Sequence, residues 1–229
     1  RVAAKKPLLR KQNVAKRLAF AKDHVNWTNE QWGQVLFSDE SKFEIFGNKR
    51  RLFIRRFEGE RYKKYCLQPT VKHGGGSIMV WGAISTKGAL PLKRIEVKMD
   101  MKVYHQILIR HVLPGGKRLL GRGFTFQEDN DPKHASKLCR GYLDRKENAG
   151  EVIRMVWPPQ SPDLNPIEQI WDHVDTKIRK MCNTSKNSLW VNLQTAWDDI
   201  SINTFSKYIN TMKSRCQAVI DAKGGHTRF

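Results

Sequence analysis

The second half of the chain alternates between strand and helix patterns, and this alternation limits the possible folds more than any other feature. Residues 124–129 and 152–156 have the composition of short, largely buried strands. A helix pattern follows each strand, the first after Pro132 and the second after Asn165. Further extended segments come earlier in the chain, at 35–46, 77–84 and 88–97. This order of elements predicts an α/β fold in which a mixed sheet is flanked by helices.

The stretch from Trp157 to Val174, WPPQSPDLNPIEQIWDHV, contains the start of the second of these helices. Asn165 is a favourable N-cap residue, and Pro166 suits the first helical position, where no backbone N–H is needed. Glu168 then falls on the first turn. Its carboxylate either completes the cap and complements the helix dipole or projects into a metal site, and this stretch alone leaves both readings open. An apolar face follows at helical spacing: Ile167, Ile170, Trp171 and Val174.

A polar triplet, Ser38-Asp39-Glu40, directly follows three apolar residues. The pattern predicts a buried strand over 35–37, a polar interruption, and a second extended segment over 42–46. Alternation places Asp39 on the same face as Phe37 and places Glu40 on the opposite face. Asp39 is therefore either a turn-forming residue at a strand end or a functional carboxylate.

Two aspartates follow the strand at 124–129. Asp131 precedes Pro132 at an expected helix start, so it is best explained as an N-cap. Asp129 then stands at the strand end without a structural role. Asp39, Asp129 and Glu168 come from separate elements that a mixed sheet can bring to one edge. Carboxylates are preferred ligands of Mg²⁺ and Mn²⁺, and two such ions could activate water and stabilise the leaving oxygen at a phosphodiester.

The chain is strongly basic, with 42 Lys and Arg against 22 Asp and Glu and a formal charge of +20. A charge of this sign spread along the chain predicts a polyanionic partner, most simply nucleic acid, although solubility or an acidic protein partner would also account for it. Residues 49–64 form the densest basic segment. As a strand with an apolar inner face, this segment would suit a phosphate backbone; a charge-protected edge strand and a nuclear import signal are the alternatives.

Residues 1–33 are predicted to form a helical N-terminal segment or linker. Thr28 with Gln31 is a capping-box pattern that opens a short helix. The preceding helix has an apolar face and a basic face, and we favour a packing helix with a solvated basic face over a helix that reads DNA. The basic residues concerned are Lys11, Lys16, Arg17 and Lys22.

A helix near 104–112 is expected to end before the Pro-Gly-Gly sequence at 114–116, and two amphipathic helices are expected over about 189–200 and 205–222. No apolar run is long enough to span a membrane. The four cysteines form no Cys-x-x-Cys pair, which favours a reducing compartment.

Three motifs and the terminal GGHTRF together resemble the Tc1 branch of the Tc1/mariner DNA transposases. The motifs are LFSDESKFEIFG, FQEDNDPKHASK and WPPQSPDLNPIEQIW. The resemblance implies an RNase H-like fold over 34–229 and cut-and-paste transposition. It also implies a catalytic, metal-binding triad made of Asp39, Asp129 and Glu168, with two Mg²⁺ ions as cofactor and Mn²⁺ as a substitute.

The resemblance further implies double-stranded DNA as partner, both transposon ends and target, a homo-oligomer in the DNA complex, and a nuclear location. The basic, glycine-rich insert at about 47–76 would correspond to the loop that such transposases use for subunit contacts and DNA. The residues we expect to contact DNA are Lys49, Arg50, Arg51, Arg55 and Arg56.

Two departures from the family pattern are visible. The number of residues between Asp129 and Glu168 is 38, more than is usual in the branch, and we expect the extra residues in the polar stretch 144–150. The family's N-terminal paired-type DNA-binding region is not represented. Two other functions stay open: a domesticated DNA-binding protein that has kept the fold without the chemistry, and an RNase H-like nuclease that acts on RNA–DNA hybrids.

Overall fold

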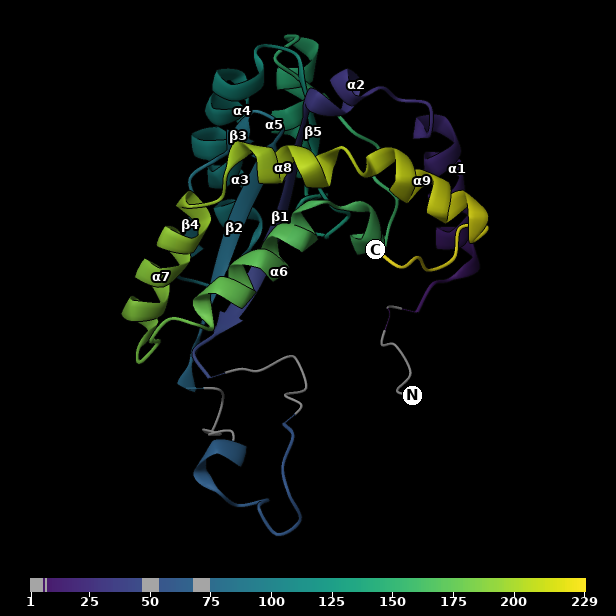
Figure 1. The fold of residues 1–229 in the computed structure, drawn as a ribbon. Coiled ribbons are helices and arrows are strands. Elements are labelled where there is room, and N and C mark those ends of the chain that lie inside the picture. Colours follow the sequence, from purple (N-terminus) through teal and green to yellow (C-terminus); the bar gives the residue numbers. More distant parts are fainter. Residues whose placement is uncertain (1–5, 7, 47–53, 68–74) are drawn as a thin grey trace.

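The computed structural model describes residue 6 and residues 8–46, 54–67 and 75–229, and at its centre lies a mixed sheet (Figure 1). Within these residues the strands are β1 (Val35–Glu44), β2 (Ser77–Ser85), β3 (Gly88–Ala89), β4 (Lys93–Ile95), β5 (Phe124–Gln127) and β6 (Val152–Arg154). Their order is β3-β2-β1-β5-β6, with β4 also paired to β2. Strands β1 and β2 are antiparallel, whereas β5 is parallel to both β1 and β6. The predicted mixed sheet is confirmed.

Helices cover both faces of the sheet (Figure 1). One face packs against α1 (Lys11–His24), α6 (Ile167–Ile178), α7 (Lys186–Asp198), α8 (Ile202–Ile209) and α9 (Met212–Asp221). The other face packs against α3 (Met101–Ile107), α4 (Leu113–Leu120) and α5 (Lys137–Asn148). Successive residues of β1 point to opposite faces of the sheet, so the strand contributes to the hydrophobic core on each face. Val35 and Phe37 lie in the first core, and Leu36 lies in the second.

The N-terminal helices share the core of the sheet. The predicted capping box of Thr28 and Gln31 is present and opens α2 (Asn29–Gly33). Phe20 of α1 and Trp32 of α2 lie in the same hydrophobic cluster as strands β1 and β2, while a domain boundary between residues 33 and 34 stays a prediction. The expectation that Arg17 lies on a solvated face is wrong: its side chain is 1% exposed and is paired with Asp163.

Strand β1 runs without a break through Ser38-Asp39-Glu40, so the predicted polar interruption is wrong. The reason is the antiparallel partner, since β2 pairs with β1 residue by residue from Phe37 to Glu44. The parallel partner β5 pairs only with Val35 to Phe37. Asp39 therefore lies inside a strand rather than at its end, just beyond the point where β1 and β5 separate.

The helix predicted to end before residue 114 instead continues to Leu120. A π-helical turn, η3 (Leu108–Val112), joins α3 to α4, and Pro114 is the second residue of α4. The two glycines that follow are helical because they face the core. A Cβ on Gly115 would overlap Leu90, and a Cβ on Gly116 would overlap the Phe124 ring.

The region between β5 and β6 also differs from the prediction. Helix α5 begins at Lys137 with Ser136 as its N-cap. Asp131 instead caps the preceding turn, where its Oδ1 accepts from the Lys133 backbone N–H at 2.9 Å. The polar stretch 144–150, expected to be a surface connection, is mostly the end of α5. Its Glu147 accepts a hydrogen bond from the Arg154 backbone N–H, so this stretch is tied to β6.

The predicted C-terminal helix over 205–222 is divided into α8 and α9. In the basic insert, residues 54–67 contain a turn and a short 3₁₀ helix, η1 (Lys64–Cys66), rather than a strand. Phe57 is 82% exposed, so the expected apolar inner face is absent from this part of the insert. Arg55 and Arg56 are exposed. The other three expected DNA contacts lie outside the described residues: Lys49, Arg50 and Arg51.

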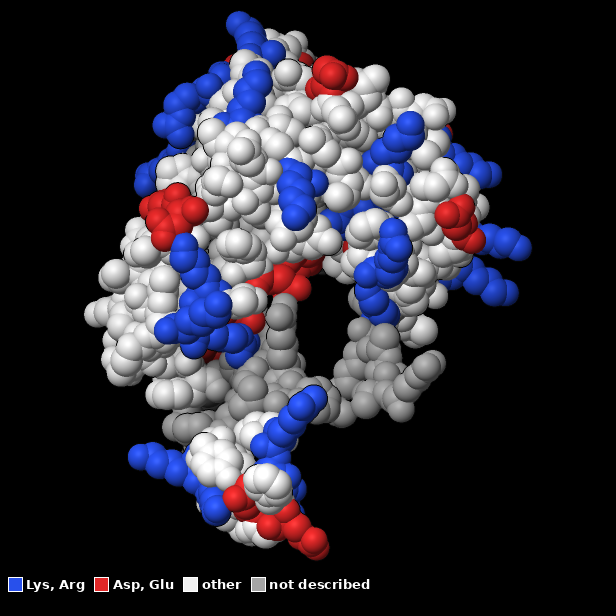
Figure 2. Space-filling view, in the orientation of Figure 1, with Lys and Arg blue, Asp and Glu red and all other residues white. Residues whose placement is uncertain are grey.

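The charge distribution follows the composition. Figure 2 shows lysine and arginine side chains over much of the visible face, while acidic side chains gather in the hollow beside α6. Within the described ranges, no helix has the length and apolar character needed to cross a bilayer.

The glycine at the α4 contact yields a stability prediction. We expect Gly116→Ala to lower the free energy of unfolding by about 1–3 kcal/mol, because the new methyl group must displace the Phe124 ring. Gly141→Ala in α5 is the matched control. There the added Cβ would meet only Arg145 Nη1 at 3.8 Å, and alanine should stabilise the helix by up to about 1 kcal/mol. Urea unfolding of both variants checks this, and equal stabilities would contradict the packing account.

Candidate active site

A cleft of about 340 Å³ opens beside β1 and the start of α6 and contains all three predicted carboxylates. Asp39 comes from β1, Asp129 from the segment after β5, and Glu168 from the first turn of α6. The segment leading to α6 forms much of the remaining wall: Trp157, Pro158, Pro159, Gln160, Ser161, Pro162 and Asn165. The structure thus brings the three residues together from three separate elements.

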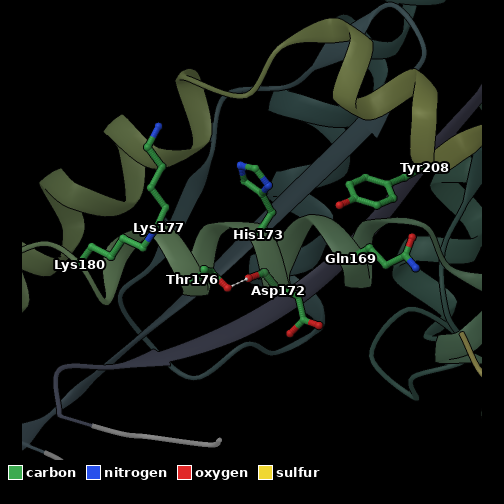
Figure 3. A pocket seen from close by; sticks show the side chains of 7 residues that line it. All are labelled: Gln169, Asp172, His173, Thr176, Lys177, Lys180 and Tyr208. Carbon is green, nitrogen blue, oxygen red and sulfur yellow. Dashed lines mark hydrogen bonds between the residues drawn. The ribbon is translucent and has the colours of Figure 1, made fainter.

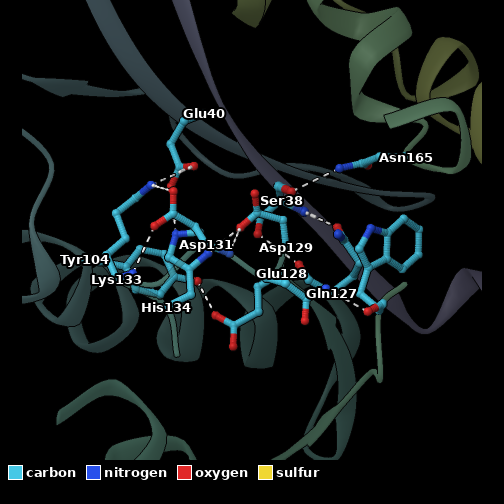
Figure 4. A network of polar contacts seen from close by, with 12 residues as sticks. Ser38, Glu40, Tyr104, Gln127, Glu128, Asp129, Asp131, Lys133, His134 and Asn165 are labelled. Atoms are coloured by element: carbon cyan, nitrogen blue, oxygen red, sulfur yellow. Dashed lines mark hydrogen bonds and ion pairs between the residues drawn. The ribbon is translucent and has the colours of Figure 1, made fainter. Parts of the chain in front are cut away.

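Two buried amides fix the elements that carry the carboxylates. The Asn165 side chain accepts from the Ile167 backbone N–H at 3.3 Å and donates to the Ser38 carbonyl at 3.2 Å. It therefore makes the predicted capping bond, although α6 begins at Ile167, one residue later than predicted, and it also joins α6 to the residue before Asp39. Gln127 links the strands on the other side, because its Oε1 accepts from the Ser38 N–H and its carbonyl accepts from the Ser38 hydroxyl (Figure 4).

Asp39 is the most enclosed of the three carboxylates. Its Oδ2 accepts a hydrogen bond from Trp171 Nε1 at 3.2 Å. Trp171 can lie across the sheet because its neighbour on β2 is Gly82, where a Cβ would stand 2.7 Å from the ring. Burial raises the pKa of the Asp39 carboxyl well above its usual range, and the negative charges of Glu168 and Glu40 raise it further.

Asp129 contacts a charged histidine. His134 Nδ1 lies 2.6 Å from Asp129 Oδ1, although the N–H direction is poorly aligned, so the contact is an ion pair rather than a well-formed hydrogen bond. On the other side of the ring, His134 Nε2 lies 3.2 Å from Glu40 Oε1 (Figure 4). Partial burial acts to raise the pKa of Asp129, but the contact with His134 outweighs it and the pKa is lowered.

Neighbouring aromatic and polar residues hold His134 in place. The Tyr104 ring stacks on it with centroids 3.8 Å apart, and the Tyr104 hydroxyl donates to Glu128. Lys133 Nζ lies 2.7 Å from Asp131 and 3.9 Å from Glu40. Two cations, His134 and Lys133, therefore lie among the carboxylates. They are on the opposite side of β1 from Trp171.

The three carboxylates fit a hard divalent cation by their chemistry and by their shared cleft. Their mutual repulsion, visible in the raised pKa of Asp39, is what a cation would relieve. Among the described residues, no three His, Cys, Asp or Glu side chains are close enough together to coordinate a metal ion in their present positions. Asp129 is turned toward His134, so binding a cation between all three carboxylates would require the Asp129 side chain to turn.

A second and larger cleft, of about 520 Å³, runs along the outer side of α6 and contains none of the three carboxylates (Figure 3). Its walls carry groups of both signs: Gln169, Asp172, His173, Thr176, Lys177, Lys180 and Tyr208. Size alone therefore does not identify the site in this molecule. The three carboxylates that line the smaller cleft identify it instead.

The sequence pattern assigned no role in the site to His134, Glu40 or Tyr104, and it gave Trp171 a packing role only. Alternation had placed Glu40 on the face opposite Asp39, and the contacts of Glu40 with His134 and of Asp39 with Trp171 confirm it. His134 lies in the FQEDNDPKHASK motif, so its position could have marked it. The stacking of Tyr104 depends on a helix far away in the sequence, and no local pattern indicates it.

The chain is similar in sequence to a known family of nucleases and to several transposases. Residues 34–189 match the family described as DDE superfamily endonuclease. The Tcb2 transposase of Caenorhabditis briggsae is 42% identical over 226 residues, which is 99% of this chain and 81% of that protein. The Tc1 transposase of Caenorhabditis elegans is 41% identical over 229 residues, covering 100% and 82% of the two chains.

Solved structures support the fold. The Mos1 transposase paired-end complex with left transposon end superimposes with a TM-score of 0.82 at 15% identity, covering 100% of this chain and 67% of that one. The Mos1 catalytic domain with raltegravir and Mg gives 0.72 at 14% identity, covering 97% and 100%. The fold is thus the RNase H-like fold of DDE nucleases.

The chain belongs to the DDE superfamily of endonucleases, and within it to the Tc1/mariner transposases. This confirms the resemblance drawn from the three motifs. The same comparisons favour a transposase, which is both a nuclease and a strand transferase, over a DNA-binding protein that has kept only the fold.

The His134 ion pairs predict a pH dependence of stability in metal-free protein. Burial acts to lower the pKa of His134, but the contacts with Asp129 and Glu40 outweigh it and raise the pKa to about 10. Because this exceeds the unfolded value of about 6.5, the stabilisation is complete below pH ~6.5 and is lost as the pH rises toward 10. The loss should be on the order of a few kcal/mol.

Urea unfolding in EDTA between pH 6 and 10 measures this loss. His134→Gln, which cannot gain a proton, should show a flatter profile than the parent over this interval. Parallel profiles for the two proteins would show that the imidazole carries no extra proton in the folded state.

Proposed function

We propose that Asp39, Asp129 and Glu168 are the catalytic carboxylates of this transposase and that they bind two Mg²⁺ ions, or Mn²⁺ in their place. The observation that supports this most is their convergence on one cleft from β1, the segment after β5, and α6. A divalent cation bound there would activate the attacking oxygen and stabilise the leaving oxygen at a phosphodiester. Several Mos1 structures named with Mg or Mn support the same choice of ion.

The surrounding residues would prepare the carboxylates for that cation. Trp171 holds one oxygen of Asp39, which leaves the other oxygen for a ligand. His134 keeps Asp129 ionised, since it lowers the pKa of that carboxyl. Asn165 fixes the first turn of α6 to β1 and so sets the separation between Glu168 and Asp39.

We propose double-stranded DNA, transposon ends and target, as the substrate. The charge of +20 and the exposed Arg55 and Arg56 support a phosphate backbone as partner. The structural neighbours include complexes named as paired-end and strand-transfer complexes of Mos1. A paired-end complex brings two ends together, so we also propose a homo-oligomer in the DNA complex, acting in the nucleus.

The triad assignment predicts the effect of removing each carboxylate. Asp39→Ala, Asp129→Ala and Glu168→Ala should each reduce Mg²⁺-dependent cleavage of a transposon-end duplex by at least about 10³-fold, a barrier increase of about 4 kcal/mol. Asp131→Asn is the matched control, because the asparagine oxygen can still cap the turn at Lys133. Cleavage rates with circular dichroism of each variant decide the matter; normal cleavage by folded Glu168→Ala would refute the assignment.

The basic insert predicts a change in the salt dependence of DNA binding. Replacing Arg55 and Arg56 by Gln should weaken binding to duplex DNA and reduce the slope of log K against log salt by about 0.9 for each lost phosphate contact. The control replaces Lys87 and Arg118 by Gln. Both are exposed near the amino ends of β1 and β5, away from the carboxylates. Equal slopes for the two double variants would show that the insert does not meet the phosphates.

A further inference from the structure

Asp163, in the segment that leads to α6, is held by two arginines from opposite ends of the chain. Arg17 of α1 donates to both carboxylate oxygens of Asp163, each at 2.6 Å. Arg215 of α9 donates to the Asp163 backbone carbonyl, also at 2.6 Å. Arg17 and Arg215 are 1% exposed and Asp163 is 7% exposed. We call these three residues the polar lock.

The polar lock reaches a residue in the wall of the carboxylate cleft. Gln160 has a φ of 53°, in the left-handed region that non-glycine residues seldom adopt. Arg17 Nη1 donates to its carbonyl at 3.3 Å, and Asn13 of α1 donates to its side-chain oxygen at 2.7 Å. Helix α1 therefore holds a strained residue of the cleft wall in place.

The polar lock also reaches the residue beside Glu168. Arg215 donates to the side-chain oxygen of Gln169 on the first turn of α6, where Figure 3 shows Gln169. Toward the C-terminus, Arg17 Nε donates to the Gly224 carbonyl at 3.0 Å, and the Thr227 hydroxyl donates to Asp163 at 2.8 Å. The contacts of the lock thus hold residues 160, 163 and 169, before and after the start of α6.

These contacts indicate a role in geometry beyond stability. A buried ion pair is a weak source of stability compared with apolar side chains of the same size. Apart from the ion pair, the two arginines donate to four backbone carbonyls, to the Thr211 hydroxyl and to the Gln169 side-chain amide. Three of these acceptors, on residues 160, 163 and 169, fix the path of the segment that carries Glu168.

We propose that Arg17 and Arg215 are positioning residues for the transposase reaction, which act through Asp163 and Gln169 to fix Glu168 relative to Asp39. The proposal rests on the catalytic role of Glu168 given above. A misplacement of about 1 Å can cost on the order of 10²-fold in rate. Loss of the polar lock should therefore lower kcat and leave the binding of DNA nearly unchanged.

The first test removes one contact without a change in size. Gln169→Met abolishes the acceptor for Arg215, and Gln217→Met, an exposed residue of α9 bonded to Asp221, is the matched control. For Gln169→Met we expect kcat to fall by about fivefold or more, with KM for the transposon-end duplex within about twofold of the parent. The control should match the parent in both constants.

The second test removes the ion pair itself. A single substitution would leave a buried charge without its partner and could unfold the protein, so Arg17→Met and Asp163→Leu are combined. In the folded double variant, kcat should fall by about 30-fold or more, and amide hydrogen exchange of residues 160–169 should accelerate by about tenfold or more. If the double variant does not fold, Gln169→Met decides alone.

The proposal is overturned if the folded variants keep the parental kcat and the parental exchange of residues 160–169. Failure of the proposed function looks different, because folded Glu168→Ala would then cleave the transposon-end duplex normally with Mg²⁺. Amide exchange in the parent and the variants would still report whether the polar lock fixes residues 160–169.

Discussion

Repulsion among carboxylates in one cleft is the constraint on which the rest of this structure depends. Asp39 is partly buried near Glu168 and Glu40, and the pKa of its carboxyl is raised well above the usual range. On the other side of β1, the positive charge of His134 lies between Asp129 and Glu40. Acidic groups this close together require positive charges beside them. In metal-free protein His134 and Lys133 neutralise part of the negative charge, and a divalent ion in the cleft would neutralise the rest.

The scaffold holds the acidic groups with a few buried polar contacts. Ser38 is the meeting point, since its backbone and hydroxyl bond to Gln127 on one side and its carbonyl to Asn165 on the other. Gly82 leaves room for Trp171, which bonds to Asp39. The sheet thus supplies rigid backbone next to the carboxylates, and helices α1 and α9 brace the segment that leads to Glu168. Such rigidity suits chemistry that depends on orientation.

Much of this could be predicted from the sequence, because local signals were strong. The strand and helix order gave the mixed sheet, and the cap at Asn165 placed the start of α6 to within one residue. Predictions were wrong where distant partners override local pattern: pairing with β2 carries β1 through Asp39, and core contacts keep the glycines of α4 helical. Buried Arg17 looked like a surface charge because its partner, Asp163, is far away in the sequence. The surroundings of His134 likewise depend on tertiary contacts with Tyr104 and Glu40.

The central claim is that Asp39, Asp129 and Glu168 together bind the divalent ion. Anomalous diffraction from crystals of this chain soaked in Mn²⁺ tests it most directly, because it locates the ion without relying on activity. The account predicts a manganese peak within coordination distance, about 2.0–2.6 Å, of oxygens from all three carboxylates, with Asp129 turned away from His134. A peak bound by other residues, or none at millimolar Mn²⁺, would contradict it.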